Sequence, residues 1–221
     1  MITIDRLTLR TEERTLLDGV TMHLTEGAVH VLAGPAGAGK TALLDTLFGL
    51  RRPASGSVAR FGRPLNRRET IYVPRNPRLY EGLTVGDVAE LALGDRTDPA
   101  DELAALLDRF GLRPSAPLDD PVLQRQTALV AALLRHPSVL LLDEPFEGFG
   151  PAALRTARQL LLERQAAGTT VVVASRRFPP MADIADDLHL LEGGRIVAVY
   201  RREELARLLL GAQVSGGGKT T

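Results

Sequence analysis

The segment that most constrains the fold of this 221-residue chain is AVHVLAGPAGAGKTALLDTLF, residues 28–48. It begins with an apolar run typical of a strand and continues through a glycine-rich loop. It ends in a helical pattern, because Leu43, Leu44, Leu47 and Phe48 share one face of a helix. Further apolar runs alternate with amphipathic helical segments along the chain. We therefore predict an α/β fold with a mostly parallel sheet that is covered on both faces.

The remaining elements are predicted from the spacing of apolar residues, which repeats every two residues in a strand and every 3.6 residues in a helix. Residues 1–33 predict short strands, whose alternating apolar and polar residues suggest a half-exposed antiparallel layer. Two strands are expected at 57–61 and 69–74, and the segment between Val85 and His136 is mostly helical by periodicity. In the rest of the chain, strands are predicted in VLLLDEP and TTVVVAS, with a helix from Pro151 to Gly168 between them. A helix start at Pro179–Pro180, a hairpin turning at Gly193–Gly194 and a last helix near 202–210 are predicted to follow.

The loop sequence GPAGAGKT fits the pattern G-x-x-x-x-G-K-[ST] and lies between the predicted strand and helix, as a phosphate loop must. Its backbone N–H groups and the helix N-terminus favour a bound phosphate. Lys40 is expected to reach the β and γ phosphates of a nucleotide, and the Thr41 hydroxyl to bind Mg²⁺. The alternative is a glycine-rich turn that matches by chance. The predicted phosphate-binding residues are Gly34, Pro35, Ala36, Gly37, Ala38, Gly39, Lys40 and Thr41.

A second acidic motif follows the apolar run VLLL, in the sequence VLLLDEP. A buried parallel strand that ends in Asp143 and Glu144 places two carboxylates at the sheet edge where open α/β folds bind ligands. Asp143 suits a role as Mg²⁺ ligand, and Glu144 suits positioning or deprotonating an attacking water. The alternative is an acidic helix cap. Together the two motifs predict that the chain binds a nucleotide with Mg²⁺.

Composition excludes several other classes of function. The 27 basic and 27 acidic residues cancel, so no net charge favours nucleic acid as a partner. The chain has no cysteine, and its four histidines are scattered without ligand spacing, so a metal is expected to be held by oxygen. No apolar run approaches the roughly 20 residues that span a bilayer, and the N-terminus does not resemble a signal peptide. A cytoplasmic location is therefore expected.

Over nearly its whole length the chain resembles the nucleotide-binding subunit of ATP-binding cassette (ABC) transporters. The resemblance rests on the two motifs above and on YVPRNPRLYEGLTVGDV (72–88), ALLRHPSVLLLDEP (132–145) and LLEGGRIVA. It implies one domain over 1–210, with a P-loop NTPase core and an inserted α-helical subdomain at about 82–136. The glycine-rich composition of the tail 211–221 predicts disorder. It also implies an ATPase that lies on the inner face of the cell membrane, with transmembrane permease subunits and a second nucleotide-binding subunit as partners.

The chain departs from the family at three positions that contact nucleotide. In the family an aromatic ring near the N-terminus stacks on adenine, but the aligned residue here is Thr11, and losing such a ring weakens binding roughly 10- to 100-fold. Arg10 is an alternative stacking partner. Arg75 stands where the family has a glutamine that contacts Mg²⁺ and water, and it is expected either to pair with phosphate or to face solvent. Arg176 stands where a histidine bridges the γ-phosphate to the catalytic glutamate.

Two segments that act across the family's dimer also differ. The signature LSGGQ is replaced by LDDPVLQRQTALV (118–130), in which Asp119 and Asp120 are expected to cap a helix and would repel phosphate. EGFG (147–150) replaces a stretch that ends in a signalling aspartate, so Gly150 stands where the family has that residue.

These observations favour an ATP-binding subunit that hydrolyses ATP slowly, as a homodimer or as the degenerate half of a heterodimer. A second hypothesis is a catalytically inactive nucleotide-bound subunit with a structural or regulatory role. A third is a P-loop kinase that acts on a small molecule.

Overall fold

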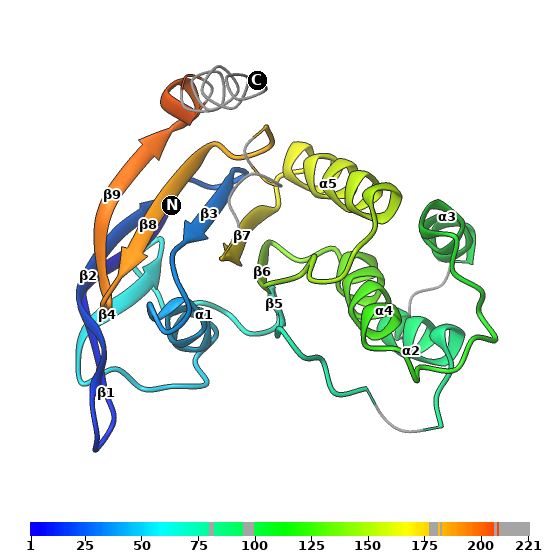
Figure 1. Ribbon diagram of the computed structural model, residues 1–221, viewed down its shortest axis with the longest axis horizontal. Helices are drawn as coiled ribbons and strands as arrows, with labels where there is room; N and C mark the ends of the chain where they lie inside the picture. The colour runs from blue at the N-terminus through cyan, green and yellow to red at the C-terminus, as the bar shows by residue number, and fades with distance from the viewer. Residues whose placement is uncertain (80–81, 95–99, 177–180, 182, 206, 208–221) are drawn as a thin grey trace, which may run out of the picture.

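A computed structural model describes residues 1–79, 82–94, 100–176, 181, 183–205 and 207. Two sheets and five labelled helices, with a further helical turn at 202–205, are arranged in layers over these residues (Figure 1). The strands are β1 (Ile2–Arg10), β2 (Thr15–Leu24), β3 (Val29–Ala33), β4 (Ser55–Arg60), β5 (Thr70–Val73), β6 (Val139–Asp143), β7 (Thr170–Ser175), β8 (Asp187–Glu192) and β9 (Arg195–Arg201). The helices are α1 (Lys40–Phe48), α2 (Val85–Leu93), α3 (Ala100–Phe110), α4 (Pro121–Leu134) and α5 (Pro151–Ala166).

The smaller sheet is the predicted antiparallel layer. It has three strands in the order β2-β1-β4, and β1 pairs antiparallel with both neighbours. One face is buried, since side chains of β2 alternate between buried and exposed from Gly19 to Leu24. The third predicted N-terminal strand, β3, belongs to the other sheet. All five of its residues are buried, and such a run is typical of a strand covered on both faces.

The larger sheet has six strands in the order β5-β6-β7-β3-β8-β9. Every pairing is parallel except the last, in which β8 and β9 form the predicted hairpin through Gly193 and Gly194. This order confirms the prediction of an α/β fold with a mostly parallel sheet. It also brings the carboxyl ends of β3, β6 and β7 side by side, although they are far apart in the sequence.

Alternate residues of the central strands point into two different cores. Val31, Leu140 and Val173 pack with α2, α3, α4 and α5, which lie on one side of the sheet in Figure 1. Leu32 and Leu141 pack instead with α1 and with the smaller sheet. Helix α1 is therefore held between the two sheets, which fixes the loop that precedes it.

The helices of the segment 85–134 also match their prediction. Helix α4 begins at Pro121, and Asp120 caps it: the carboxylate accepts hydrogen bonds from the backbone N–H groups of Val122 (3.3 Å) and Leu123 (3.1 Å). Among the described residues, no helix has both the length and the apolar character needed to cross a bilayer. The predicted helix start at Pro179–Pro180 and the tail 211–221 lie outside the described residues, as does most of the predicted last helix after residue 205.

Two histidines that look unrelated in the sequence meet a buried carboxylate where β3 pairs with β8. The Oδ1 atom of Asp187 lies 2.8 Å from Nδ1 of His30 and 3.0 Å from Nε2 of His189, and Oδ2 accepts a hydrogen bond from Arg201. Burial alone raises the pKa of a carboxyl, but hydrogen bonds from His189 and His30 hold the pKa of Asp187 well below its usual range. This network joins the first strand of the parallel sheet to its last hairpin.

Replacing Asp187 with asparagine is expected to lower the free energy of unfolding by roughly 3 kcal/mol, because two buried histidines and Arg201 lose their shared carboxylate. The stabilisation should be present above about pH 4 and be lost as the pH falls through the lower pKa of the folded state. Urea denaturation at neutral pH measures it. Asp18→Asn breaks an exposed pair with Arg195 and is the control, with an expected loss below about 1 kcal/mol. Equal losses in the two variants would contradict this account of the network.

Candidate nucleotide site

The loop from Gly34 to Thr41 connects the carboxyl end of β3 to the first turn of α1. Gly39 occupies the N-cap of α1 with φ 108°, a left-handed conformation that glycine adopts without a steric cost. The side chain of Lys40 folds back over the loop, and its ammonium group donates hydrogen bonds to the carbonyl oxygens of Gly34 (2.7 Å) and Pro35 (2.9 Å). Burial lowers the pKa of Lys40. The loop thus encloses a positive charge beside the N-terminus of a helix, which is a favourable site for an anion.

The first glycine of the loop is required by packing. Gly34 has φ 155°, and a Cβ atom added there would lie 2.1 Å from the carbonyl oxygen of Leu191 in β8. Gly34→Ala is therefore expected to push the loop away from the sheet and to weaken ATP binding by at least roughly tenfold. Isothermal titration with ATP measures the effect. Gly37→Ala is the control for lost backbone freedom without a clash, because a Cβ atom there meets nothing within 4 Å. An equal loss of affinity in both variants would show that the contact with β8 is unimportant.

Asp143 ends β6 beside the first turn of α1. Its Oδ2 atom accepts a hydrogen bond of 2.6 Å from the Thr41 hydroxyl, and its Oδ1 atom is buried without a hydrogen-bond partner in the described part of the chain. Burial raises the pKa of Asp143, and the Thr41 hydrogen bond offsets part of this effect. A buried carboxylate oxygen that lacks a partner, next to a hydroxyl oxygen, is a donor set that suits Mg²⁺. The predicted metal ligands therefore lie together and fit that ion.

Glu144 follows directly and has an unusual backbone conformation. Its φ of 45° is in the left-handed region, and its N–H donates to the carbonyl oxygen of Ala174 in β7. This turn aims the carboxylate along the ends of β6 and β7. There it accepts hydrogen bonds from the Arg176 N–H (2.9 Å) and the Ser175 hydroxyl (3.4 Å). A strained residue held by its surroundings is common at functional sites.

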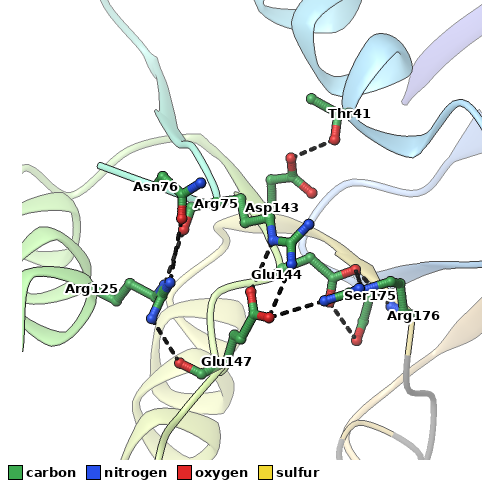
Figure 2. A network of polar contacts seen from close by, with 9 residues as sticks. All are labelled: Thr41, Arg75, Asn76, Arg125, Asp143, Glu144, Glu147, Ser175 and Arg176. Atoms are coloured by element: carbon green, nitrogen blue, oxygen red, sulfur yellow. Dashed lines mark hydrogen bonds and ion pairs between the residues drawn. The ribbon is translucent and has the colours of Figure 1, made fainter. Parts of the chain in front are cut away.

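The two arginines that the sequence singled out converge on one carboxylate (Figure 2). Arg75 binds Glu147 through two hydrogen bonds, from Nε to Oε2 (2.8 Å) and from Nη2 to Oε1 (3.0 Å). Arg176 donates from Nη2 to the same Oε1 atom (3.0 Å), and its Nε atom lies 3.3 Å from Glu144. Arg75 thus makes an ion pair that neither sequence alternative foresaw.

A cavity of about 250 Å³ joins these groups. Its walls include the loop residues from Ala36 to Thr41 together with Asp143, Glu144, Arg75 and Arg176. All the predicted site residues except Gly34 and Pro35 therefore border one space, and Lys40 hydrogen-bonds to those two.

The sequence did not single out four further residues that line the cavity: Arg14, Leu16, Ala42 and Arg51. Thr11 was the aligned position for a base contact, but its hydroxyl donates a hydrogen bond of 3.1 Å to the carbonyl oxygen of Arg14 in the turn between β1 and β2. The side of the cavity at this turn is therefore formed by Arg14, in place of Thr11 or Arg10. The sequence TEERT, residues 11–15, predicts a turn, and this turn was the one signal that the side chain of Arg14 would reach the cavity.

Comparison with known proteins identifies the family of the chain. The family profile for ABC transporters matches residues 17–147, which is more than half of the chain. The chain belongs to the ABC transporter family. It is an ATP-binding domain of that family. A solved ATP-binding subunit of an ABC transporter superposes on it with a TM-score of 0.85 at 25% identity, and the match covers 100% of this chain and 95% of the other. A dimeric bacterial ABC transporter cassette, at 22% identity, shares the fold with a TM-score of 0.80 over 91% of this chain and 99% of the other.

Curated ABC relatives are similar across most of the chain. An uncharacterised ABC transporter ATP-binding protein of Nostoc sp. is 33% identical over 86% of this chain and 61% of its own length. An Fe(3+) ions import ATP-binding protein of Rhodococcus jostii is 30% identical over 86% of this chain and 59% of its own length. A lantibiotic transport ATP-binding protein of Streptococcus pyogenes is 28% identical over 89% of each chain. The chain thus spans about three fifths of the length of the first two relatives.

Proposed function

We propose that this chain is an ATP-binding subunit of an ABC transporter that binds Mg-ATP in the 250 Å³ cavity and hydrolyses it slowly, to power or gate a membrane partner. One observation carries the proposal: Lys40, the Thr41–Asp143 pair and Glu144 border the same cavity, although Asp143 is 102 residues from Thr41. Residues 1–210 would form one nucleotide-binding domain with its helical subdomain at about 82–136.

Each of these residues has a defined task in the proposed reaction. The loop N–H groups and the Lys40 ammonium bind the β and γ phosphates. Thr41 and Asp143 hold Mg²⁺, which neutralises charge on the phosphates when it is bound. Glu144 orients a water molecule and accepts its proton as the water oxygen bonds to the γ phosphorus and the bond to the leaving ADP oxygen breaks. Lys40 reaches phosphate only if its ammonium exchanges part of its hydrogen bonding to Gly34 and Pro35.

Slow hydrolysis is proposed because Arg176 contacts the group that must accept the proton. Its N–H is hydrogen-bonded to Glu144, and its guanidinium lies 3.3 Å from the same carboxylate. Glu144 must give up part of these contacts before it can orient a water molecule and accept its proton. The same observation favours the second hypothesis, a catalytically inactive nucleotide-bound subunit. Because the chain belongs to the ABC transporter family, we do not propose the third hypothesis, a small-molecule kinase.

The partners of this chain are proposed from those of transport proteins in its family. Transmembrane permease subunits are expected, together with a second nucleotide-binding subunit, in a homodimer or a heterodimer. The partner subunit in a heterodimer would supply an intact signature, because the start of α4 presents the capping carboxylate of Asp120 in its place. Co-purification from membranes, followed by ATP turnover in the isolated complex, tests this proposal. Magnesium-dependent turnover above that of the free chain supports it, and recovery of the chain without any membrane protein would contradict it.

A further inference from the structure

Glu147 lies between the two arginines of the nucleotide site and belongs to neither predicted motif. We propose that Glu147 is an internal competitor of the γ-phosphate for Arg75 and Arg176, and that it thereby sets how strongly the site prefers a nucleoside triphosphate to a diphosphate. The inference rests on the proposed function, since it concerns the same cavity. Its basis is the arrangement of three side chains from the ends of β5, β6 and β7 (Figure 2).

The guanidinium groups stand between Glu147 and the phosphate loop. Arg75 and Arg176 line the cavity beside Lys40, whereas Glu147 lines an adjoining, larger cleft of about 740 Å³. Arg176 borders both spaces. Glu144, the expected water-binding group, marks the γ-phosphate end of the cavity, and the backbone N–H of Arg176 is bonded to it. A γ-phosphate would therefore approach the two arginines from the side opposite Glu147.

The ion pairs of Glu147 with Arg75 and Arg176 have short hydrogen bonds but are accessible to solvent. Hydrogen bonds from Arg75 hold the pKa of Glu147 below its usual range, so the carboxylate is charged at neutral pH. The side chains of Arg75, Glu147 and Arg176 are 41%, 37% and 39% exposed. Ion pairs with this exposure contribute little net stability, so a phosphate with a similar oxygen geometry can displace them.

The backbone around Glu147 is fixed, so exchange involves the side chains. Arg125 of α4 donates from Nε to the carbonyl oxygen of Arg75 (3.0 Å) and from Nη1 to the carbonyl oxygen of Glu147 (3.1 Å). The next residue, Gly148, has φ 84°, and a Cβ atom there would lie 2.6 Å from the side chain of Val122. Arg125 therefore ties the backbone of Glu147 to that of Arg75, so the carboxylate is held near the arginines, where its charge opposes that of a γ-phosphate.

Glu147→Gln removes this competing charge while it keeps the size of the side chain and one acceptor oxygen. We expect it to tighten ATP binding roughly three- to tenfold and to change ADP affinity by less than about twofold, because ADP has no γ-phosphate. Isothermal titration of the full chain with each nucleotide in the presence of Mg²⁺ measures both affinities. Glu163→Gln is the matched control, because Glu163 also makes a two-point pair, with Arg109, between α5 and α3. It should leave both affinities unchanged.

A second pair of variants shows whether Glu147 acts through the arginines. In a chain that carries Arg75→Gln and Arg176→Gln, adding Glu147→Gln should no longer tighten ATP binding. The inference is overturned if Glu147→Gln weakens ATP binding or leaves it unchanged, if ADP gains equally, or if the gain persists without the arginines. If wild type binds ATP through Lys40 and one of these results is found, only the inference fails. If wild type shows no ATP binding that depends on Lys40, the proposed function and the inference fail together.

Discussion

Replacing Glu144 with glutamine is expected to lower ATP turnover of the assembled transporter complex by roughly 10²- to 10⁴-fold, the usual contribution of a general base. Glutamine keeps the length of the side chain and an oxygen that can accept the hydrogen bond from the Arg176 N–H, but it cannot accept a proton from water. The steady-state rate of phosphate release, measured in the complex with Mg-ATP in excess, gives the effect. ATP affinity is expected to stay within about threefold of wild type.

This substitution also separates the two hypotheses for the subunit. Glu163→Gln, at the ion pair between α5 and α3, is again the control and should leave turnover unchanged. Equal turnover in wild type and Glu144→Gln would mean that the chain does not catalyse hydrolysis, which supports the inactive regulatory subunit. A loss of turnover accompanied by an equal loss of ATP affinity would instead mean that Glu144 serves binding.

Replacing Lys40 with methionine should have a comparably large effect on ATP affinity. Methionine keeps an unbranched apolar stem and removes the ammonium group, which is expected to contact two phosphates. Hydrogen bonds to charged groups each contribute about 1.5–3 kcal/mol, so we expect ATP binding to weaken by roughly 100-fold or more. Equilibrium titration with a fluorescent ATP analogue at constant Mg²⁺ measures the change.

The Lys40 variant needs a test of folding, because the ammonium also binds the carbonyl oxygens of Gly34 and Pro35. The thermal unfolding midpoint without nucleotide shows whether the loop or the core has collapsed. An unchanged midpoint with a large loss of affinity supports direct phosphate contact. Binding within about threefold of wild type would contradict the role of Lys40.

Local sequence patterns were sufficient to predict the phosphate loop and the acidic strand end. The loop needs glycine at fixed spacings, then lysine and threonine at the start of a helix, so its geometry follows from neighbouring residues. Asp143 and Glu144 were placed by one general rule, that ligands bind at the carboxyl edge of a parallel sheet. The structure brings Asp143 within hydrogen-bonding distance of Thr41, as that rule implies.

Contacts between distant segments were not predictable in the same way. Arg75 and Glu147 are separated by 72 residues, and His30 and Asp187 by 157. Both pairs depend on which strands are neighbours, and an apolar run such as VHVLA does not specify its neighbours. For the same reason β3 was grouped with the antiparallel layer, although it lies between β7 and β8. The side chain at the β1–β2 turn was also missed, because it depends on how that turn closes.

The most direct test of the account is an equilibrium titration of the wild-type chain with ATP, performed with Mg²⁺ and again with Mg²⁺ removed by a chelator. The account predicts saturable binding at one site per chain, and weaker binding without Mg²⁺ because Asp143 then faces the phosphates uncompensated. Absence of saturable binding in the presence of Mg²⁺ would contradict the central claim that the cavity between Lys40 and Glu144 is a nucleotide site.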